Sequence, residues 1–560
     1  MPSNTEKQLE EVKQHVIHGR FQEGLKVIED SLKKKNISKE DKLAYLNFKG
    51  EISNYLGNLQ DALQLADQVL KESEKLDNLL LKVDALTVKS IALIWLAKVK
   101  EGIETANEGL KVISEVKNLP AKVIAERKAY LLAWKNAALA QLGDYEKIFD
   151  IHKEAISLAE ESGNKLITSL CYCMLGVSYL VIEDKIEKCE VLLNKAQTIA
   201  NELGNKVLIA FISIFFAYLS RSRRKYEEAI NFFNKAFSLS KEARSTLLLL
   251  YYGDLGSLYV SIYQLDKALE CYQESSKYAI LGKHIYYLGI GYVYFLKYEL
   301  KKAQEYYLKS VKISEEIRDR RILPIALYNL ILISIELKNL DQAQKYLNYL
   351  DEIGKETSYK HITVRAHFAS ILVLKASGEI SDLTEASKKL DEFLAIDNLH
   401  VSWRLNALYS LLEIRIKELQ ITSNESTLEE VKKQAIRLEV EAEEQHYHWL
   451  LANVYRLQSQ LALVELNAQS ALKLLEKAQK IADEINNEIL KKAIKEDQEK
   501  IDKQLGMLND LQKQKAPINE TIKLVSLEST VKNIKQETVL EDRDESGQII
   551  EYRKLFALKI

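Results

Sequence analysis

Apolar stretches alternate with short polar segments along most of the chain, and this pattern predicts a succession of helical hairpins. Two of the polar segments are nearly identical: Glu-Ser-Gly-Asn-Lys at 161–165 and Glu-Leu-Gly-Asn-Lys at 202–206. The glycine of each segment suits the left-handed position that follows a helix. The predicted hairpins span 5–35, 40–74, 79–115, 121–161, 165–202, 206–240, 244–279, 283–316, 321–353, 360–394, 400–443 and 445–484.

Small and aromatic residues recur at fixed places within these hairpins. In the clearest example, Ala268 lies twelve positions after Gly256, and Tyr272 follows four positions later. Larger side chains at the small positions would push packed helices beyond their usual separation of about 8–10 Å. Related sets occur at Gly291, Ala303 and Tyr307, and, with one inserted residue, at Gly176, Cys189 and Leu193.

This pattern resembles the tetratricopeptide repeat. The equivalent residues Ala229, Ala268, Ala303 and Ala343 are separated by 39, 35 and 40 residues, whereas the usual period is about 34. The array therefore resembles a long-period variety with longer helices. The resemblance implies an all-α fold, a right-handed α-α superhelix (solenoid) of about 11–12 helical hairpins.

The array is predicted to occupy residues 1–485, with the clearest repeats at 40–350 and degenerate repeats at 360–485. A capping helix is predicted over 486–514, because a terminal helix with one apolar face would close the end of the array. A dimerising coiled coil is the alternative for this helix. Its apolar stripe consists of Leu490, Ile494, Ile501, Leu505 and Leu508.

The C-terminal tail, residues 515–560, is rich in β-branched residues over 521–531 and again from 536. This pattern predicts a β-hairpin with strands near 538–540 and 549–552 around a polar turn that ends at Gly547. Because an isolated hairpin is only marginally stable in water, we expect the tail to dock on another surface. That surface is the array itself, a second copy of the chain or a different partner.

The composition supports a helical protein without a strong electrostatic field. Hydrophobic residues make up 47% and charged residues 29%, and there are only 4 prolines and 19 glycines, which disfavour helix interiors. The 79 basic and 81 acidic residues nearly cancel, so nucleic acid is not an expected partner.

The chain is expected to be cytoplasmic. Its N-terminal segment is polar and lacks the apolar run of a secretory signal. The most apolar stretch, 207–220, is shorter than the ~20 residues that cross a bilayer, so no membrane span is expected. The four cysteines, at 171, 173, 189 and 271, are predicted to be small core residues in a reducing compartment.

No motif predicts catalysis. The chain lacks the glycine-rich phosphate and dinucleotide loops, the zinc-protease helix motif and the nucleophile-elbow motif. Gly354-Lys355-Glu356-Thr357 lacks the upstream glycine of a phosphate loop. We therefore expect no enzyme activity, no catalytic residue, no cofactor and no bound metal.

The candidate site follows from the resemblance, since the first helix of each tetratricopeptide hairpin lines the concave face. The corresponding positions form an apolar and aromatic surface, which suits a peptide or protein segment. Tight winding of the array, which would bury the same residues, is the alternative. The candidate partner-binding residues are Phe211, Ile214, Tyr218, Arg221, Ile285, Leu288, Tyr292, Phe295 and Tyr328.

The expected function is that of a non-catalytic scaffold or adaptor that binds a peptide or protein in an apolar, aromatic concave groove. A second possibility is a peptide- or ligand-responsive regulator, although no effector module such as a DNA-binding domain is visible. A remote third is an accessory helical domain of an enzyme complex.

Overall fold

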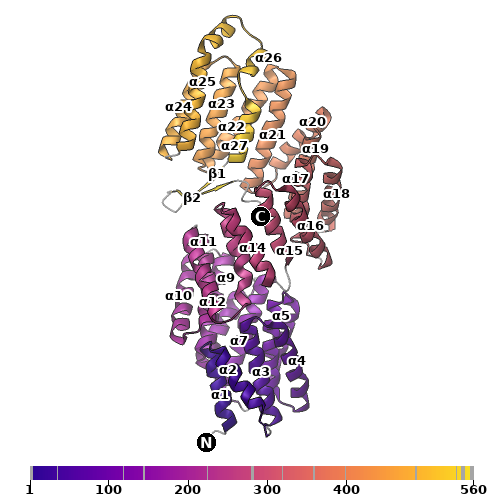
Figure 1. Ribbon diagram of the computed structural model, residues 1–560, viewed down its shortest axis with the longest axis vertical. Coiled ribbons are helices and arrows are strands. Elements are labelled where there is room, and N and C mark those ends of the chain that lie inside the picture. Colours follow the sequence, from indigo (N-terminus) through magenta and orange to yellow (C-terminus); the bar gives the residue numbers. More distant parts are fainter. Residues whose placement is uncertain are drawn as a thin grey trace. The chain divides into compact units, whose positions relative to one another are not determined.

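The computed structural model describes most of the chain, and Figure 1 shows it as a series of paired helices. The described residues are 4–34, 36–117, 119–142, 146–183, 185–223, 225–278, 283–317, 319–356, 360–397, 399–485, 488–537, 539–543 and 549–554. They form two compact units, one of Met1–Leu258 with Cys271–Lys283 and one of Tyr259–Glu270 with His284–Ile560.

Helical hairpins make up the first unit, in which each hairpin has a first (A) helix and a second (B) helix. They are α1 (Asn4–Ile17) and α2 (Phe21–Leu32), α3 (Lys39–Leu56) and α4 (Leu59–Lys75), α5 (Leu79–Trp95) and α6 (Val99–Glu115), α7 (Ala121–Leu142) and α8 (Ile148–Ser162), α9 (Lys165–Glu183) and α10 (Ile186–Leu203), α11 (Lys206–Ser222) and α12 (Tyr226–Glu242). A 3-10 turn η1 (Leu247–Tyr251), α13 (Tyr252–Ser261) and α14 (Leu265–Tyr278) follow.

The second unit continues the same pattern. Its hairpins are α15 (Lys283–Leu296) and α16 (Leu300–Glu316), α17 (Leu323–Glu336) and α18 (Leu340–Glu356), α19 (Lys360–Ser377) and α20 (Ile380–Leu394), α21 (Val401–Thr422) and α22 (Glu425–Glu444), α23 (His448–Val464) and α24 (Ala468–Glu484). The described helices from α1 to α24 thus pair into twelve hairpins, which confirms the predicted all-α class and most of the predicted boundaries.

The Gly-Asn pairs of the two near-identical linkers end one helix and begin the next. Gly163 and Gly204 have φ angles of 74° and 64°, the left-handed conformation that glycine adopts without strain. The side-chain oxygen of Asn205 then accepts the backbone N–H of Leu208, at 3.0 Å, and caps α11. Local sequence alone therefore sets these helix boundaries.

Small residues lie where the helices of a hairpin touch, as the repeat pattern predicts. A methyl group added at Gly102 of α6 would lie 2.7 Å from Ile94 Cγ1 and 3.3 Å from the Ser90 carbonyl of α5. Ser90 Oγ donates a hydrogen bond to the Gly102 carbonyl at 2.8 Å, so the two backbones approach closely. The repeat alanines Ala62, Ala229, Ala268, Ala303, Ala343 and Ala471 are all fully buried.

Two loop–loop contacts close the first unit across almost 200 residues of sequence. In the first, which we call the 19/205 closure, Asn205 Nδ2 donates to the Ile17 carbonyl at 3.1 Å, and His18 Nδ1 bonds the Leu203 carbonyl at 2.8 Å. In the second, the Thr246 N–H donates to the Leu56 carbonyl at 3.0 Å. The loops are so close that a Cβ at Gly19 would lie 2.6 Å from Asn205 Oδ1.

The C-terminal segment covers the last hairpins of the second unit. Helix α25 (Glu488–Lys513) packs against α24 and buries Leu490, Ile494, Ile501 and Leu508. Helix α27 (Leu527–Glu537) packs against α21 and α23, the A helices of two successive hairpins. Gln460 of α23 and Thr530 of α27 exchange hydrogen bonds of 2.9 and 3.1 Å. This part of the tail therefore docks within the chain.

The β-prone prediction is wrong for the first part of the tail. Residues Ile518–Thr521 form α26, Ile522–Leu524 form η2, and α27 follows. Leu527, Val531 and Ile534 are buried on one helical stripe, and burial of this stripe outweighs the strand preference of the β-branched residues. Further on, β1 (Val539–Arg543) and β2 (Ile549–Lys554) pair in antiparallel fashion, and the turn predicted between them lies partly outside the described residues.

All four cysteines are buried, as predicted. Within the described residues, α9 is the one helix whose length and composition would allow it to cross a membrane. It packs against α10 in its own hairpin, and most of its residues are buried there, as in the core helix of a large array.

We predict opposite effects for the same substitution at two helical glycines. Gly102→Ala should lower the free energy of unfolding by about 1–2 kcal/mol, because the added methyl group overpacks the α5–α6 contact. In Gly506→Ala of α25, the added methyl group has no atom within 4 Å. This substitution should raise the free energy of unfolding by up to about 1 kcal/mol, because alanine has the higher helix propensity. Urea denaturation followed by circular dichroism measures both, and equal effects would contradict the packing argument.

We predict that Asn205→Ala destabilises the protein by about 2–3 kcal/mol, because it removes a helix cap and the side-chain donor of the part-buried Ile17 carbonyl in the 19/205 closure. Asn424→Ala is the matched control. Asn424 is exposed and caps α22 through the N–H of Thr427, at 2.8 Å. Its loss should cost only about 1 kcal/mol. Similar losses in thermal or urea denaturation would show that the closure contributes nothing beyond the cap.

Candidate binding site

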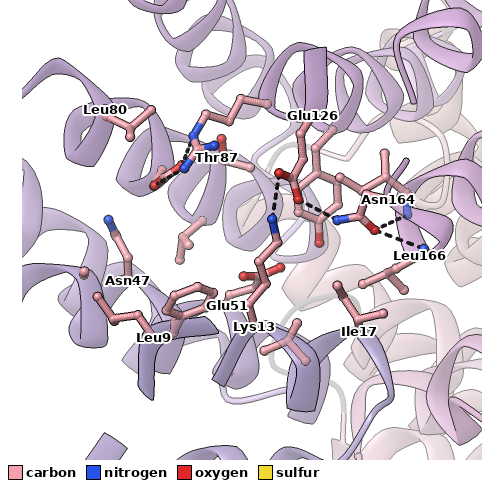
Figure 2. A pocket seen from close by; sticks show the side chains of 18 of the residues that line it. Leu9, Lys13, Ile17, Asn47, Glu51, Leu80, Thr87, Glu126, Asn164 and Leu166 are labelled. Carbon is pink, nitrogen blue, oxygen red and sulfur yellow. Dashed lines mark hydrogen bonds and ion pairs between the residues drawn. The ribbon is translucent and has the colours of Figure 1, made fainter. Parts of the chain in front are cut away.

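A cavity of about 300 Å³ lies among the A helices of the first five hairpins, all within the first unit. Residues of α1, α3, α5, α7 and α9 line it (Figure 2). Its apolar walls include Leu9, Ile17, Phe48, Leu80 and Leu166. A volume of this size is at the lower end of the range for ligand pockets.

Two ion pairs hold the polar side chains of the cavity in place. Lys13 Nζ of α1 lies 2.8 Å from Glu126 Oε2 of α7. Arg127 of α7 donates from Nε and Nη2 to the two carboxylate oxygens of Asp84 on α5, at 2.7 and 3.0 Å. Asn164, before α9, donates to Glu126 at 2.6 Å. Each pair joins two different hairpins, so the ion pairs also fix the cavity's width.

Glu51 of α3 lies among these groups without a hydrogen bond or ion pair to another described side chain. In Figure 2 no interaction joins it to Lys13 or Glu126. The pKa of Glu51 is raised to about 7, first by burial and then by the nearby Asp84 and Glu126 carboxylates, against the opposing effect of Lys13 and Arg127. The carboxyl group therefore changes charge near neutral pH.

Asn47, one helical turn before Glu51, offers a second acceptor to the cavity. Its Nδ2 donates to the Leu81 carbonyl of α5 at 3.2 Å, and this fixes which end of the amide is the oxygen. Its Oδ1 atom has no hydrogen-bond partner, and water cannot replace one easily because the residue is only 7% exposed. The Oδ1 atoms of Asn54 and Asn136 also lack a partner, and Asn47 differs from them in that it lines this cavity.

A smaller apolar cavity of about 30 Å³ adjoins the first, and Tyr130 lines both. The hydroxyl groups of Tyr130 and Tyr55 are 2.6 Å apart, and burial raises the pKa of both phenols. Trp95 and Phe211 meet edge to face on this side, with ring centroids 6.3 Å apart. A space of this size accommodates about one water molecule rather than a ligand.

The predicted partner-binding residues are distributed over both units, and none lines the cavity of about 300 Å³ in the first unit. Phe211 lines the small cavity, Ile214 is fully buried, and Arg221 is exposed. Tyr218 packs against Phe215, Phe233 and Tyr251. Tyr218 also bonds the buried Asp254 carboxyl, whose pKa is raised by burial.

In the second unit, Leu288, Tyr292 and Tyr328 are buried, Phe295 is half-buried, and Ile285 is exposed. The buried members, together with Ile214, therefore contribute to the core and offer little surface to a partner. The aromatic A-helix positions were expected to face a groove. Packing within each unit encloses several of them, and whether the exposed members bind a partner stays a prediction.

The cavity residues leave little signal in the sequence. Lys49 lies two positions before Glu51, and Lys82 and Lys89 lie on either side of Asp84, so the two acids resemble the ordinary charges of solvated helix faces. The candidate residues predicted from the A-helix positions begin at Phe211, so they include neither Glu51 nor Asp84. Which charges meet across the cavity depends on the arrangement of five hairpins.

A third cavity, of about 490 Å³, lies in the second unit beside α23, α25 and α27. It is polar: Arg456 Nε lies 2.8 Å from Asp497 Oδ2, and Gln460 is bonded to Thr530. Its polar groups named here are thus satisfied by one another, in contrast to Glu51 and Asn47.

The repeat residues settle what kind of fold this is. Gly176 faces the Cys189 carbonyl of the partner helix, and a Cβ there would lie 3.2 Å from it. A Cβ at Gly291 would lie 2.9 Å from the Tyr307 ring. In these two hairpins the small residue of the A helix thus meets the small or aromatic residue of its B helix, as the repeat pattern predicts. The fold is that of a tetratricopeptide-repeat array.

No family model and no curated protein sequence matches the chain. Several solved structures of the tetratricopeptide type are similar to the chain. A Rap protein complexed with Competence and Sporulation Factor is 13% identical, with 63% of this chain and 98% of that chain covered, at a TM-score of 0.45. The human IFIT1 dimer with m7Gppp-AAAA is 14% identical (84% and 95% covered, TM-score 0.40). Yeast Tom70 is 13% identical (88% and 99%, TM-score 0.35). These similarities carry no information about the ligand.

We predict a pH-dependent stabilisation by Glu51→Gln. Because the pKa of Glu51 is raised in the folded state, the folded protein keeps a proton that the unfolded chain releases between pH 4.5 and about 7, so stability falls as pH rises through this window. Gln mimics the protonated form. The substitution should therefore stabilise more at pH 8 than at pH 5, by on the order of 2 kcal/mol.

Urea denaturation at the two pH values measures this difference. Glu29→Gln, at an exposed position of α2, is the control and should have the same small effect at both. An equal effect of Glu51→Gln at pH 5 and pH 8 would show that the carboxyl group is not held in an unfavourable environment.

Proposed function

We propose that the protein is a non-catalytic interaction scaffold, and that the cavity lined by α1, α3, α5, α7 and α9 holds a short peptide or a segment of a partner protein. The observation that carries this proposal is the cavity itself, which combines apolar walls with polar groups that lack partners. Ligand sites typically combine an apolar lining with a few placed polar groups.

The architecture of the site supports a segment rather than a small metabolite. Five successive A helices contribute to the lining, so the polar contacts are spread along the array. An extended segment presents side chains and backbone groups at regular intervals, which suits such a series.

The buried cysteines fit a reducing compartment, and we place the protein in the cytoplasm.

A second candidate, a ligand-responsive regulator, is favoured by the position of the cavity next to the 19/205 closure. Val16 and Ile17 line the cavity, and Asn205 Nδ2 bonds the Ile17 carbonyl. A ligand held between α1 and α9 would stabilise the closed arrangement of the loops, because it would contact both sides. In that case ligand binding changes the first unit's rigidity.

Filling the cavity tests the proposal. Twelve-residue peptides are selected from a random display library on the full-length protein, synthesised, and titrated by fluorescence anisotropy. Ala44 lines the cavity, and Ala44→Trp should weaken the selected peptides at least tenfold by occupying their space. Ala121→Trp, at an exposed position of α7, is the matched control and should bind as the original protein does.

Circular dichroism must show unchanged helicity in both variants. The proposal is wrong if no peptide is enriched, or if the enriched peptides bind the Ala44→Trp variant with undiminished affinity.

A further inference from the structure

We propose that the cavity of the first unit selects a ligand with one cationic group, an ammonium or guanidinium on an otherwise apolar peptide segment, which pairs with Glu51 and Asn47 of α3. This inference rests on the proposed function, because it names the chemistry of the ligand at the same site.

The charges that line the cavity are out of balance by one. Three carboxylates line it, those of Glu51, Asp84 and Glu126, against the two cations Lys13 and Arg127. Both cations are already engaged: Lys13 pairs with Glu126, and Arg127 pairs with Asp84 through two hydrogen bonds. The ionised Glu51 carboxylate is the one charge among the lining residues without a partner of its own.

Hydrogen bonding points to the same kind of ligand. Asn47 and Glu51 are four residues apart on α3, so their side chains lie on one face of the helix. The unpartnered atom of Asn47 is an acceptor, Oδ1, and the Glu51 carboxylate accepts as well. A ligand must therefore bring donors. An ammonium group has three N–H donors and a guanidinium has five, and neither has an acceptor.

The apolar lining accounts for the rest of the ligand. Leu9, Ile17 and Leu80 lie around the polar groups (Figure 2). The aliphatic stem of a lysine or arginine side chain packs well on such surfaces while its charged end reaches an acceptor. An anionic ligand fits poorly, since it would have to displace Glu126 or Asp84 from the cations they hold.

Binding of a cation should be coupled to the ionisation of Glu51. The other titratable groups that face it are Lys13 on α1, Asp84 on α5, and Glu126, Arg127 and Tyr130 on α7, with Tyr55 on its own helix. Because the pKa of Glu51 is raised to about 7, the cation-binding form becomes dominant only above neutral pH. Affinity for a cationic ligand therefore rises between pH 6 and pH 8.

The experiment uses peptides selected from the random twelve-residue library on the full-length protein at pH 8. We expect the selected sequences to share one lysine or arginine. Replacing it by norleucine or citrulline should weaken binding at least tenfold. Acetylating the peptide N-terminus distinguishes a terminal ammonium from a side-chain cation as the group that is bound.

Two variants link the effect to Glu51. Glu51→Gln should reduce the preference for the cationic peptide over its neutral counterpart to less than threefold and abolish the rise in affinity between pH 6 and pH 8. Glu51→Asp keeps the charge and should retain both in part. Selected peptides that carry no shared cation, or that bind equally with norleucine, overturn this inference and leave the proposed scaffold function intact. Failure to select any peptide overturns both.

Discussion

The contact between the Gly19 turn and the Asn205 linker is the constraint on which the first unit depends. It joins the first hairpin to the loop between the fifth and sixth through Asn205, His18 and the carbonyls of Ile17 and Leu203. The contact lies beside the cavity, because Ile17 of α1 both lines the cavity and bonds Asn205 through its carbonyl, and Leu166 of α9 lines the cavity as well. Repeat arrays otherwise rely on contacts between neighbouring hairpins, so this long-range contact is what gives the unit a separate interior.

The interior is unusual in its polar content. Buried carboxylates are normally paired, because burial without a partner costs several kcal/mol. Glu126 and Asp84 follow this rule through Lys13 and Arg127, whereas the half-buried Glu51 carboxylate has no ion pair among the described residues. The buried Oδ1 atom of Asn47 likewise lacks a hydrogen-bond partner. Local violations of packing rules are characteristic of functional sites, where stability is exchanged for binding. The raised pKa of Glu51 has the same physical cause, because burial disfavours the ionised carboxylate.

At the end of the second unit, the surface of the A helices is covered by another segment of the chain. There, the A helices α21 and α23 are covered by the chain's own helix α27, and the buried stripe of Leu527, Val531 and Ile534 completes the core. An A-helix surface of an array thus needs a cover, and the protein supplies one itself at this position. The cavity of the first unit has no such covering segment among its lining residues, all of which belong to the helices around it or to the linker before α9.

The sequence by itself determined the hairpins and their period. Glycines such as Gly163, alanines such as Ala229 and the apolar stripe of α25 act locally or between neighbouring helices, so their spacing is sufficient to predict them. It did not determine the site. Tyr292 and Tyr328 have the same pattern as groove residues, and only packing against the rest of the second unit decided that they are buried. The partners of Lys13, Asp84, Glu126 and Arg127, and the lack of one for Glu51, were likewise decided by the tertiary structure. The physical reason is that burial and ion pairing depend on residues far apart in the sequence, which only the packing of the hairpins within each unit brings together.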